Sequence, residues 1–209
     1  MTYKTVLLPL ILSIFVCGSA LAIDRTQLAD SSESVTPILD GSKIPNANVA
    51  LADGTPVSLQ GLVMQKPSIV LFYRGGWCPY CNRQLAGLKS IEKELVDLGY
   101  QVLAISPESP ERLQQQKLET EFAVTLISDK NLEAIQGFGV GFTLDDATSS
   151  RYSERGFNLT LNSDGKAVLP APAIFIVDKA GTVNFSYVNP NYRQRPSETL
   201  ILAAAKALK

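Results

Sequence analysis

The chain has 209 residues, 45% of them hydrophobic, and its 19 Lys and Arg nearly balance its 20 Asp and Glu. This length and hydrophobic content suit one compact domain, and so small a net charge provides no field to gather nucleic acid, so no nucleic-acid partner is expected. The sequence contains no His, which excludes Ser-His and Cys-His hydrolases and removes the commonest metal ligand.

The amino terminus has the pattern of a secretory signal peptide. Lys4 precedes an apolar run over residues 6–16, and Ala20-Leu21-Ala22 fits cleavage by signal peptidase. We interpret residues 1–22 as a removable signal peptide and expect a periplasmic or extracellular protein. A retained membrane anchor is the alternative, although the run is short and Pro9 interrupts it. Lipidation of Cys17 is a further, weaker alternative.

The mature chain opens with a polar stretch and then a short hairpin. Residues 23–45 are rich in Ser and Asp without a clear period, which predicts a poorly ordered leader segment. Asp53-Gly54 is a turn signal between two short extended pieces, Asn46 to Ala50 and Val57 to Leu59. We therefore expect a redox domain over residues 46–209 that begins with an amino-terminal hairpin.

A buried strand leads directly into a helix that carries two cysteines. The run from Ser68 to Tyr73 is β-branched and aromatic without interruption, as in a central strand buried on both faces. After the flexible turn Arg74-Gly75-Gly76, apolar residues recur at three- and four-residue steps until Gly99. The pattern predicts one long helix with Cys78 and Cys81 in its first turn.

The remaining pattern alternates strands with helices. Strands are expected over 102–106 and 124–128, and helices over 109–121 and 131–136. Residues 141–169 lack a period and predict an insertion over one sheet edge or over the active site. An antiparallel hairpin over 173–177 and 182–188 and a final helix over 197–208 complete the chain. The fold class is α/β: a largely parallel centre with antiparallel hairpins, which makes a central mixed sheet flanked by helices.

Cys78 and Cys81 are the only thiols that remain once the signal peptide is removed. A disulfide between them would close too short a loop to stabilise the fold much, so a structural disulfide is the lesser alternative to a redox pair. A metal site is least favoured, because two thiolates do not complete a zinc site and no His is present. A helix amino terminus stabilises a thiolate, so Cys78 is the expected nucleophile and Cys81 the resolving thiol.

Three further residues are candidate supports for this dithiol. Arg74 either lowers the thiol pKa and holds an oxidised substrate, or is a solvated loop residue; the sequence favours neither. Trp77 is expected to pack beside the dithiol and shield it. Pro172 directly precedes a strand, which fits either a cis Ala171-Pro172 bond or an ordinary trans proline at a strand entry.

These motifs resemble the thioredoxin superfamily. The resemblance rests on Phe72 to Cys81 and on Leu169 to Pro172 before the following strand. The hairpin, Ser128-Asp129 and the segment Asn191 to Arg195 are most similar to the peroxiredoxin-like branch of the alkyl hydroperoxide reductase C/thiol-specific antioxidant (AhpC/TSA) family. The resemblance implies a thioredoxin-like fold, a cis Pro172 packed against the dithiol, and a Cys78-Cys81 disulfide in the oxidised enzyme.

The sequence also departs from that family. Typical peroxiredoxins have a Thr where Gly75 stands and an Arg where Pro172 stands, and these two groups polarise the peroxide. Two functions are therefore considered, both thiol-dependent oxidoreductases without a cofactor or metal. The first is an antioxidant enzyme that reduces hydroperoxides through Cys78 and Cys81, with a thioredoxin-like protein or a small thiol as electron donor. The second is a thiol-disulfide reductase that acts on protein disulfides, and a metal- or partner-binding module is a distant third.

Overall fold

The computed structural model describes residues 27–119 and 124–209. The signal peptide predicted for residues 1–22, with Cys17, lies outside this range. Among the described residues, no helix is both long and apolar enough to cross a membrane. The elements in chain order are η1 (Ser32–Ser34), β1 (Asn48–Leu51), β2 (Pro56–Ser58), α1 (Leu59–Gln65), β3 (Ser68–Phe72), α2 (Pro79–Ser90), α3 (Glu92–Asp97), β4 (Gln101–Ser106), α4 (Pro110–Glu119), β5 (Thr125–Ser128), α5 (Glu133–Gly137), β6 (Gly141–Thr143), α6 (Asp146–Glu154), β7 (Val168–Pro170), β8 (Ala173–Val177), β9 (Val183–Val188) and α7 (Glu198–Ala207).

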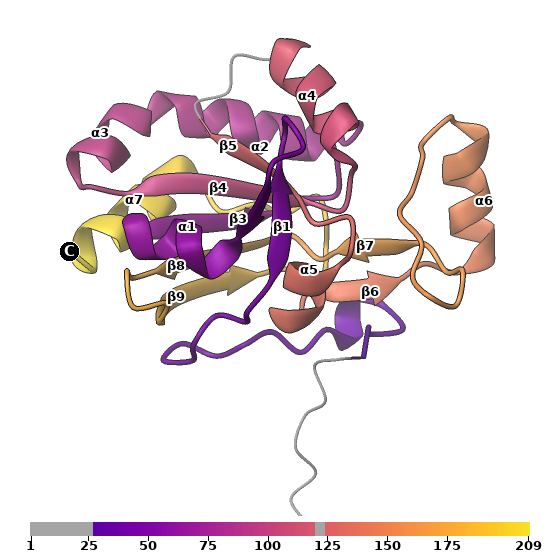
Figure 1. Ribbon diagram of the computed structural model, residues 1–209, viewed down its shortest axis with the longest axis horizontal. Helices are drawn as coiled ribbons and strands as arrows, with labels where there is room; N and C mark the ends of the chain where they lie inside the picture. Colours follow the sequence, from indigo (N-terminus) through magenta and orange to yellow (C-terminus); the bar gives the residue numbers. More distant parts are fainter. Residues whose placement is uncertain (1–26, 120–123) are drawn as a thin grey trace, which may run out of the picture.

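One sheet forms the centre of the molecule, with strand order β2-β1-β5-β4-β3-β8-β9 (Figure 1). Only β3, β4 and β5 run parallel to one another; β1, β8 and β9 pair antiparallel with their neighbours. The sheet is therefore mixed, as the fold class required, and its parallel part is limited to three strands. The two predicted hairpins, β1-β2 and β8-β9, are confirmed.

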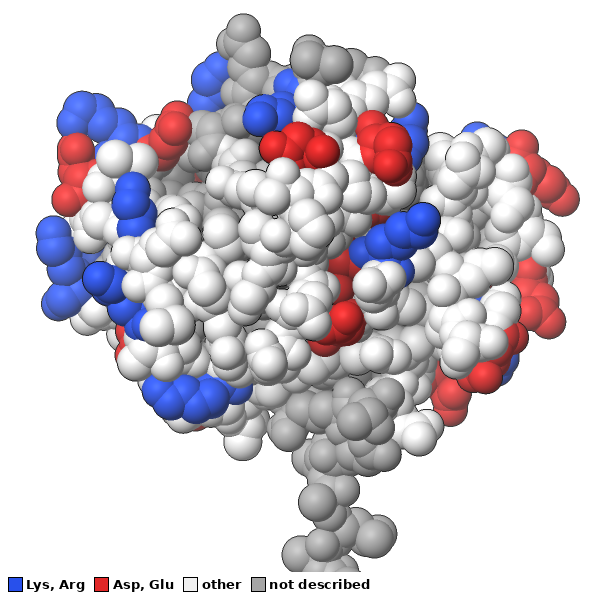
Figure 2. All heavy atoms as spheres, in the orientation of Figure 1, with Lys and Arg blue, Asp and Glu red and all other residues white. Residues whose placement is uncertain are grey.

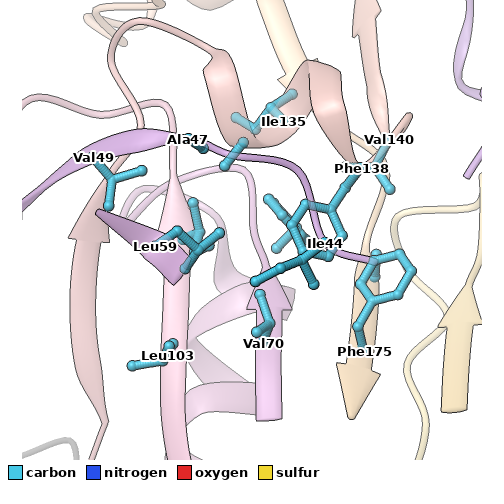
Figure 3. Close-up of a cluster of buried hydrophobic side chains, with 14 of the residues drawn as sticks. Ile44, Ala47, Val49, Leu59, Val70, Leu103, Ile135, Phe138, Val140 and Phe175 are labelled. Atoms are coloured by element: carbon cyan, nitrogen blue, oxygen red, sulfur yellow. The ribbon is translucent and has the colours of Figure 1, made fainter. Parts of the chain in front are cut away.

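Helices cover both faces of this sheet because its central strands are apolar on both sides. All five residues of β3 and all five of β8 are buried. Alternate residues of β3 point to opposite faces, so Ile69 and Leu71 pack with α2, α3 and α7, whereas Val70 and Phe72 pack with α1 and α5. Figure 3 shows the second of these clusters, in which Val70, Leu103 and Phe175 of the sheet lie beneath Leu59 of α1 and Ile135 of α5.

The prediction of a poorly ordered leader over residues 23–45 is wrong for the described part. Ile38 and Ile44 are buried in the core, and Ile44 lies among the apolar side chains of Figure 3. The backbone N–H of Ile38 donates to the Phe138 carbonyl, and that of Ile44 donates to the Gly181 carbonyl. The packed domain thus begins before Asn46, because two isolated apolar residues within a polar stretch are enough to hold it against the sheet.

The single helix predicted from Cys78 to Gly99 is broken at Ile91. Ile91 has φ −114° and ψ 7°, so it ends α2 and precedes α3. Its side chain stays buried, as does Leu95 of α3. The apolar period therefore continues through a bend, and for that reason the sequence pattern did not reveal it.

Residues 141–169 form an arm built from β6, α6 and β7. Strands β6 and β7 pair antiparallel in a small sheet of their own. Helix α6 has no buried residue and stands beside the body of the molecule (Figure 1). Asp145 caps this helix by accepting the backbone N–H of Thr148. The helix is held by its cap and by a few side chains that reach back to the domain.

Charges of both signs are scattered over the face shown in Figure 2, and neither sign forms a continuous patch there. This distribution agrees with the balanced composition of the chain.

Candidate active site

Cys78 lies at the junction between strand β3 and helix α2. It is the N-cap of α2, with φ −90° and ψ 112°, and Pro79 is the first helical residue. The N–H of Cys78 donates to the Gly75 carbonyl at 3.1 Å, which closes a tight turn after the strand. Both sulfur-bearing residues are buried, with Cys78 1% and Cys81 0% exposed, and both are free thiols here.

The two thiols differ sharply in acidity. The pKa of Cys78 is lowered to about 6, chiefly by a hydrogen bond from the Cys81 thiol and further by the Cys81 backbone N–H, Arg74 and Arg195, against the opposing effect of burial. The pKa of Cys81 is raised well above its ordinary value by burial, by the proton it donates to Cys78 and by the negative charge of Cys78. Cys78 is thus the thiolate at neutral pH, and Cys81 carries the proton.

Arg74 is a buried residue of the site, not a solvated loop residue. It is 5% exposed, and its Nη2 donates to the Tyr152 hydroxyl at 2.6 Å. Its guanidinium lies 4.4 Å from the ring centre of Tyr192, 5.1 Å from that of Trp77 and 5.4 Å from that of Tyr152. Three aromatic faces hold the cation near the dithiol without neutralising it. Its Nε is buried and has no hydrogen-bond partner among the described residues.

Trp77 packs against the apolar cluster that contains Cys78 and Cys81, and the arm supplies its aromatic partners. Its ring stacks on Phe157 with centroids 4.7 Å apart at 18°, and it meets Tyr152 of α6 at 5.3 Å. The insertion of residues 141–169 therefore reaches over the active site. Tyr152 also holds Arg74, so the arm fixes two residues of the loop that carries Cys78.

Arg195 is a site residue that the sequence reasoning noted only as part of a family-like segment. Its Nη2 donates to the Sγ of Cys81 at 3.4 Å, across 114 positions of sequence. Its Nε, like that of Arg74, is buried without a hydrogen-bond partner among the described residues. No local pattern marks this Arg, because only the return of the chain between β9 and α7 brings it to the sulfur.

The structure explains why position 75 is a glycine and not a Thr. Gly75 has φ +148°, and a Cβ built there would lie 2.5 Å from Trp77 Nε1 and 2.9 Å from the Glu108 carboxyl carbon. The space for a Thr side chain is therefore filled by the indole and by a buried carboxyl group. Glu108 accepts the N–H of Gly76 at 2.7 Å, and burial raises the pKa of Glu108.

The proline at position 172 is trans, since no cis peptide bond occurs among the described residues. The cis bond implied by the family resemblance is therefore wrong for this structure. Pro172 is a buried proline at the entry to β8, and no strand hydrogen bond is lost because the β8 ladder begins at Ala173.

A cavity of about 280 Å³ opens beside Arg74. Its inner wall includes Arg74, Pro172 and Tyr192, and its outer wall includes Tyr152 and Asp145 of the arm. Neither cysteine lines this cavity, whereas Arg74 and two of its aromatic partners, Tyr152 and Tyr192, do.

Comparison with known proteins identifies the family. The model of the AhpC/TSA family matches residues 41–186. The chain belongs to the AhpC/TSA family. Peroxiredoxin Bcp of Escherichia coli (strain K12) is 31% identical over 106 residues, 51% of this chain and 67% of that protein. A putative peroxiredoxin bcp of Haemophilus influenzae is 37% identical over 75 residues, which is 36% of this chain. The matched part spans about half, 48%, of the length of that relative.

Solved peroxiredoxin structures share the fold. Peroxidoxin BcpB of Mycobacterium tuberculosis superposes with a TM-score of 0.64 at 18% identity, covering 81% of this chain and 97% of that one. Reduced Prx3 of Vibrio vulnificus in complex with hydrogen peroxide superposes with a TM-score of 0.66 at 17% identity. The match covers 80% of this chain and 99% of that one. The predictions of a thioredoxin-like fold and of membership in this family are therefore confirmed.

Proposed function

We propose that this protein is a thiol peroxidase that reduces hydroperoxides through a cycle between the Cys78-Cys81 dithiol and the corresponding disulfide. The observation that carries the proposal is the pairing of a buried low-pKa thiolate at Cys78 with a protonated thiol at Cys81, beside two guanidinium groups. Family membership adds to it, because the relatives are named peroxiredoxins.

The cycle has two oxidative steps. The Cys78 thiolate attacks the terminal oxygen of the hydroperoxide, the O–O bond breaks, and the alkoxide leaves and takes up a proton. Cys78 is now a sulfenic acid. Cys81 then attacks the Cys78 sulfur, a disulfide forms, and the sulfenic oxygen leaves as water. An external thiol donor, either a thioredoxin-like protein or a small thiol, restores the dithiol by exchange.

Burial of the sulfurs favours a small oxidant over a protein disulfide. A disulfide substrate must place one of its sulfurs in line with the Cys78 sulfur, yet Cys78 is only 1% exposed. A hydroperoxide needs only a narrow path to the same sulfur. The guanidinium groups of Arg74 and Arg195 are positive groups near the thiolate, where a typical family member uses the Thr and Arg missing here.

The test is a rate comparison on one preparation. Peroxide consumption and insulin reduction are measured for the wild type, Cys78→Ser and Cys81→Ser under the same thiol donor. We expect rapid peroxide consumption that Cys78→Ser abolishes, and slow insulin reduction. Brisk insulin reduction together with background peroxide consumption would instead make the protein a disulfide reductase.

We also propose that the protein is exported to the periplasm or the extracellular space. The support is the amino-terminal pattern of Lys4, an apolar run and the Ala20-Leu21-Ala22 cleavage signal. An oxidising compartment permits the proposed disulfide. Sequencing the amino terminus of the mature protein from fractionated cells tests this: a start at Ile23 is expected, and a cytoplasmic protein that starts at the initiator Met contradicts it.

A further inference from the structure

Arg195 contacts the sulfur that must act second in the proposed cycle. Its Nη2 lies 3.4 Å from Cys81 Sγ, whereas the Arg74 guanidinium donates to the Tyr152 hydroxyl and lies against the rings of Trp77, Tyr152 and Tyr192. Each guanidinium therefore has a place of its own, and that of Arg195 is directly against Cys81. Its buried Nε has no hydrogen-bond partner among the described residues, so the group retains unused donor capacity in the reduced enzyme.

The charges of the site also leave room for a second anion. Neither Arg74 nor Arg195 forms an ion pair with a carboxylate among the described residues, and both lower the pKa of Cys78. The reduced enzyme thus holds two partly or fully buried cations near the Cys78 thiolate, and the buried Glu108 carboxyl group accepts the Gly76 N–H on the same loop. Once Cys78 is oxidised to a neutral sulfenic acid, neither guanidinium has the Cys78 thiolate as a partner, and a thiolate on Cys81 would supply a negative charge in its place.

Oxidation of Cys78 removes two of the three causes that keep Cys81 protonated. In the reduced enzyme these causes are burial, the hydrogen bond to Cys78 and the charge of Cys78, and the charge of Arg195 and the backbone N–H of Arg74 oppose them. A sulfenic acid at Cys78 is neutral, so the negative charge and the strong sulfur acceptor are both gone. Burial then remains on one side, and Arg195 and the backbone N–H of Arg74 remain on the other.

We propose, resting on the function proposed above, that Arg195 is a catalytic residue of the resolving step that stabilises the Cys81 thiolate by hydrogen bonding. In this step the Cys81 thiolate attacks the Cys78 sulfur, the S–S bond forms and the S–O bond of the sulfenic acid breaks. The departing hydroxide takes the proton that Cys81 released and becomes water. No further oxidant or reductant is needed, because the peroxide has already accepted the two electrons.

Arg195→Met tests the assignment, because Met keeps much of the length and loses both charge and donors. Arg193→Met is the matched control, since Arg193 lies on the same segment, is exposed and rests against Tyr192. Stopped-flow Trp77 fluorescence resolves a first phase that depends on peroxide concentration and a second phase that does not. At pH 8.5, well above the pKa of Cys78, the effect of Arg195 on the ionisation of Cys78 no longer alters the first phase.

We expect Arg195→Met to slow the second phase by at least about tenfold and the first by less than about threefold. Slower resolution leaves the sulfenic acid open to more peroxide, so mass spectrometry should detect more sulfinic acid than in the wild type. Arg193→Met should leave both phases unchanged. A second phase within twofold of wild type in folded Arg195→Met, or an equal loss in Arg193→Met, overturns the assignment.

A second measurement does not depend on peroxide. In Cys78→Ser the neutral hydroxyl replaces the charged sulfur, and the alkylation rate of Cys81 against pH reports its own ionisation. Adding Arg195→Met to this variant should move the midpoint to higher pH, and adding Arg193→Met should not. An unchanged midpoint refutes the role of Arg195. A wild type that forms no sulfenic acid refutes only the peroxidase proposal.

Discussion

The thiol of Cys78, with a pKa of about 6, is expected to be about nine-tenths ionised at pH 7, against about one per cent for a thiol at the ordinary value of 9.0. A group whose pKa is lowered keeps its anion above the shifted value and loses it as the pH falls through that value. Alkylation of Cys78 should therefore be near its plateau at pH 7, half of it near pH 6 and about a tenth of it at pH 5.

The causes of this shift predict an order among variants. The hydrogen bond from the Cys81 thiol is the largest lowering effect, and the charge of Arg74 is a smaller one. Cys81→Ala removes the thiol donor and should move the midpoint of the titration upward more than Arg74→Met does. Arg83→Met is the control, since Arg83 is an exposed residue of α2 that stacks on Tyr80 and does not contribute to the shift.

Iodoacetamide in limiting amounts, followed by intact-mass and peptide analysis, measures the rate at Cys78 across the pH range. A short peptide with one unperturbed Cys corrects for the reagent. A wild-type midpoint near 8.5 to 9 would refute the low-pKa thiolate. A larger shift in Arg74→Met than in Cys81→Ala would show that charge dominates over the hydrogen bond between the two sulfurs.

Three further predictions concern the surroundings of the dithiol. Gly75→Thr should destabilise the fold by about 1–3 kcal/mol in denaturant unfolding, because Gly75 has a φ of +148° and the Trp77 ring occupies the space for a side chain. The variant should not have higher peroxidase activity than the wild type, and a faster enzyme would contradict this. Phe157→Ala should remove the stack on Trp77, costing about 0.5–1.5 kcal/mol beyond the lost burial, and shift the emission of this sole Trp to the red, with Phe157→Leu intermediate. Burial raises the pKa of Asp129 to about 7, so between pH 4 and 7 the native state holds a proton that the unfolded chain has lost. The free energy of unfolding should therefore fall by up to about 1.4 kcal/mol per pH unit as the pH rises from 4 to 7. Asp129→Asn should flatten that slope in urea titrations at several pH values, and an unchanged slope would refute the assignment.

The sequence predicted those parts of the molecule that depend on local pattern. The unbroken apolar run of β3 and the turn before Cys78 follow from neighbouring residues, so the strand, the loop and the position of Cys78 at the start of a helix could be placed in advance. Arg195 could not, since its contact with Cys81 spans 114 positions and depends on how the chain returns after β9. The leader was misjudged for a related reason: Ile38 and Ile44 are too far apart to form a period, although each is buried. The trans bond before Pro172 was one of two geometries that the sequence allowed, and the family resemblance favoured the other.

The departure from the family pattern at Gly75 is tied to the packing of Trp77, the arm and Arg74. The Trp77 indole and Glu108 occupy the space that a side chain at position 75 would need, and the arm holds that indole through Phe157 and Tyr152. The same Tyr152 binds Arg74, and Arg74 is one of two cations beside the thiolate. Restoring a Thr at position 75 would therefore displace the ring that packs against Arg74. The arm, Gly75 and Arg74 therefore depend on one another. The positive charge near Cys78 comes here from Arg74 and Arg195, which do not occupy the positions that typical family members use.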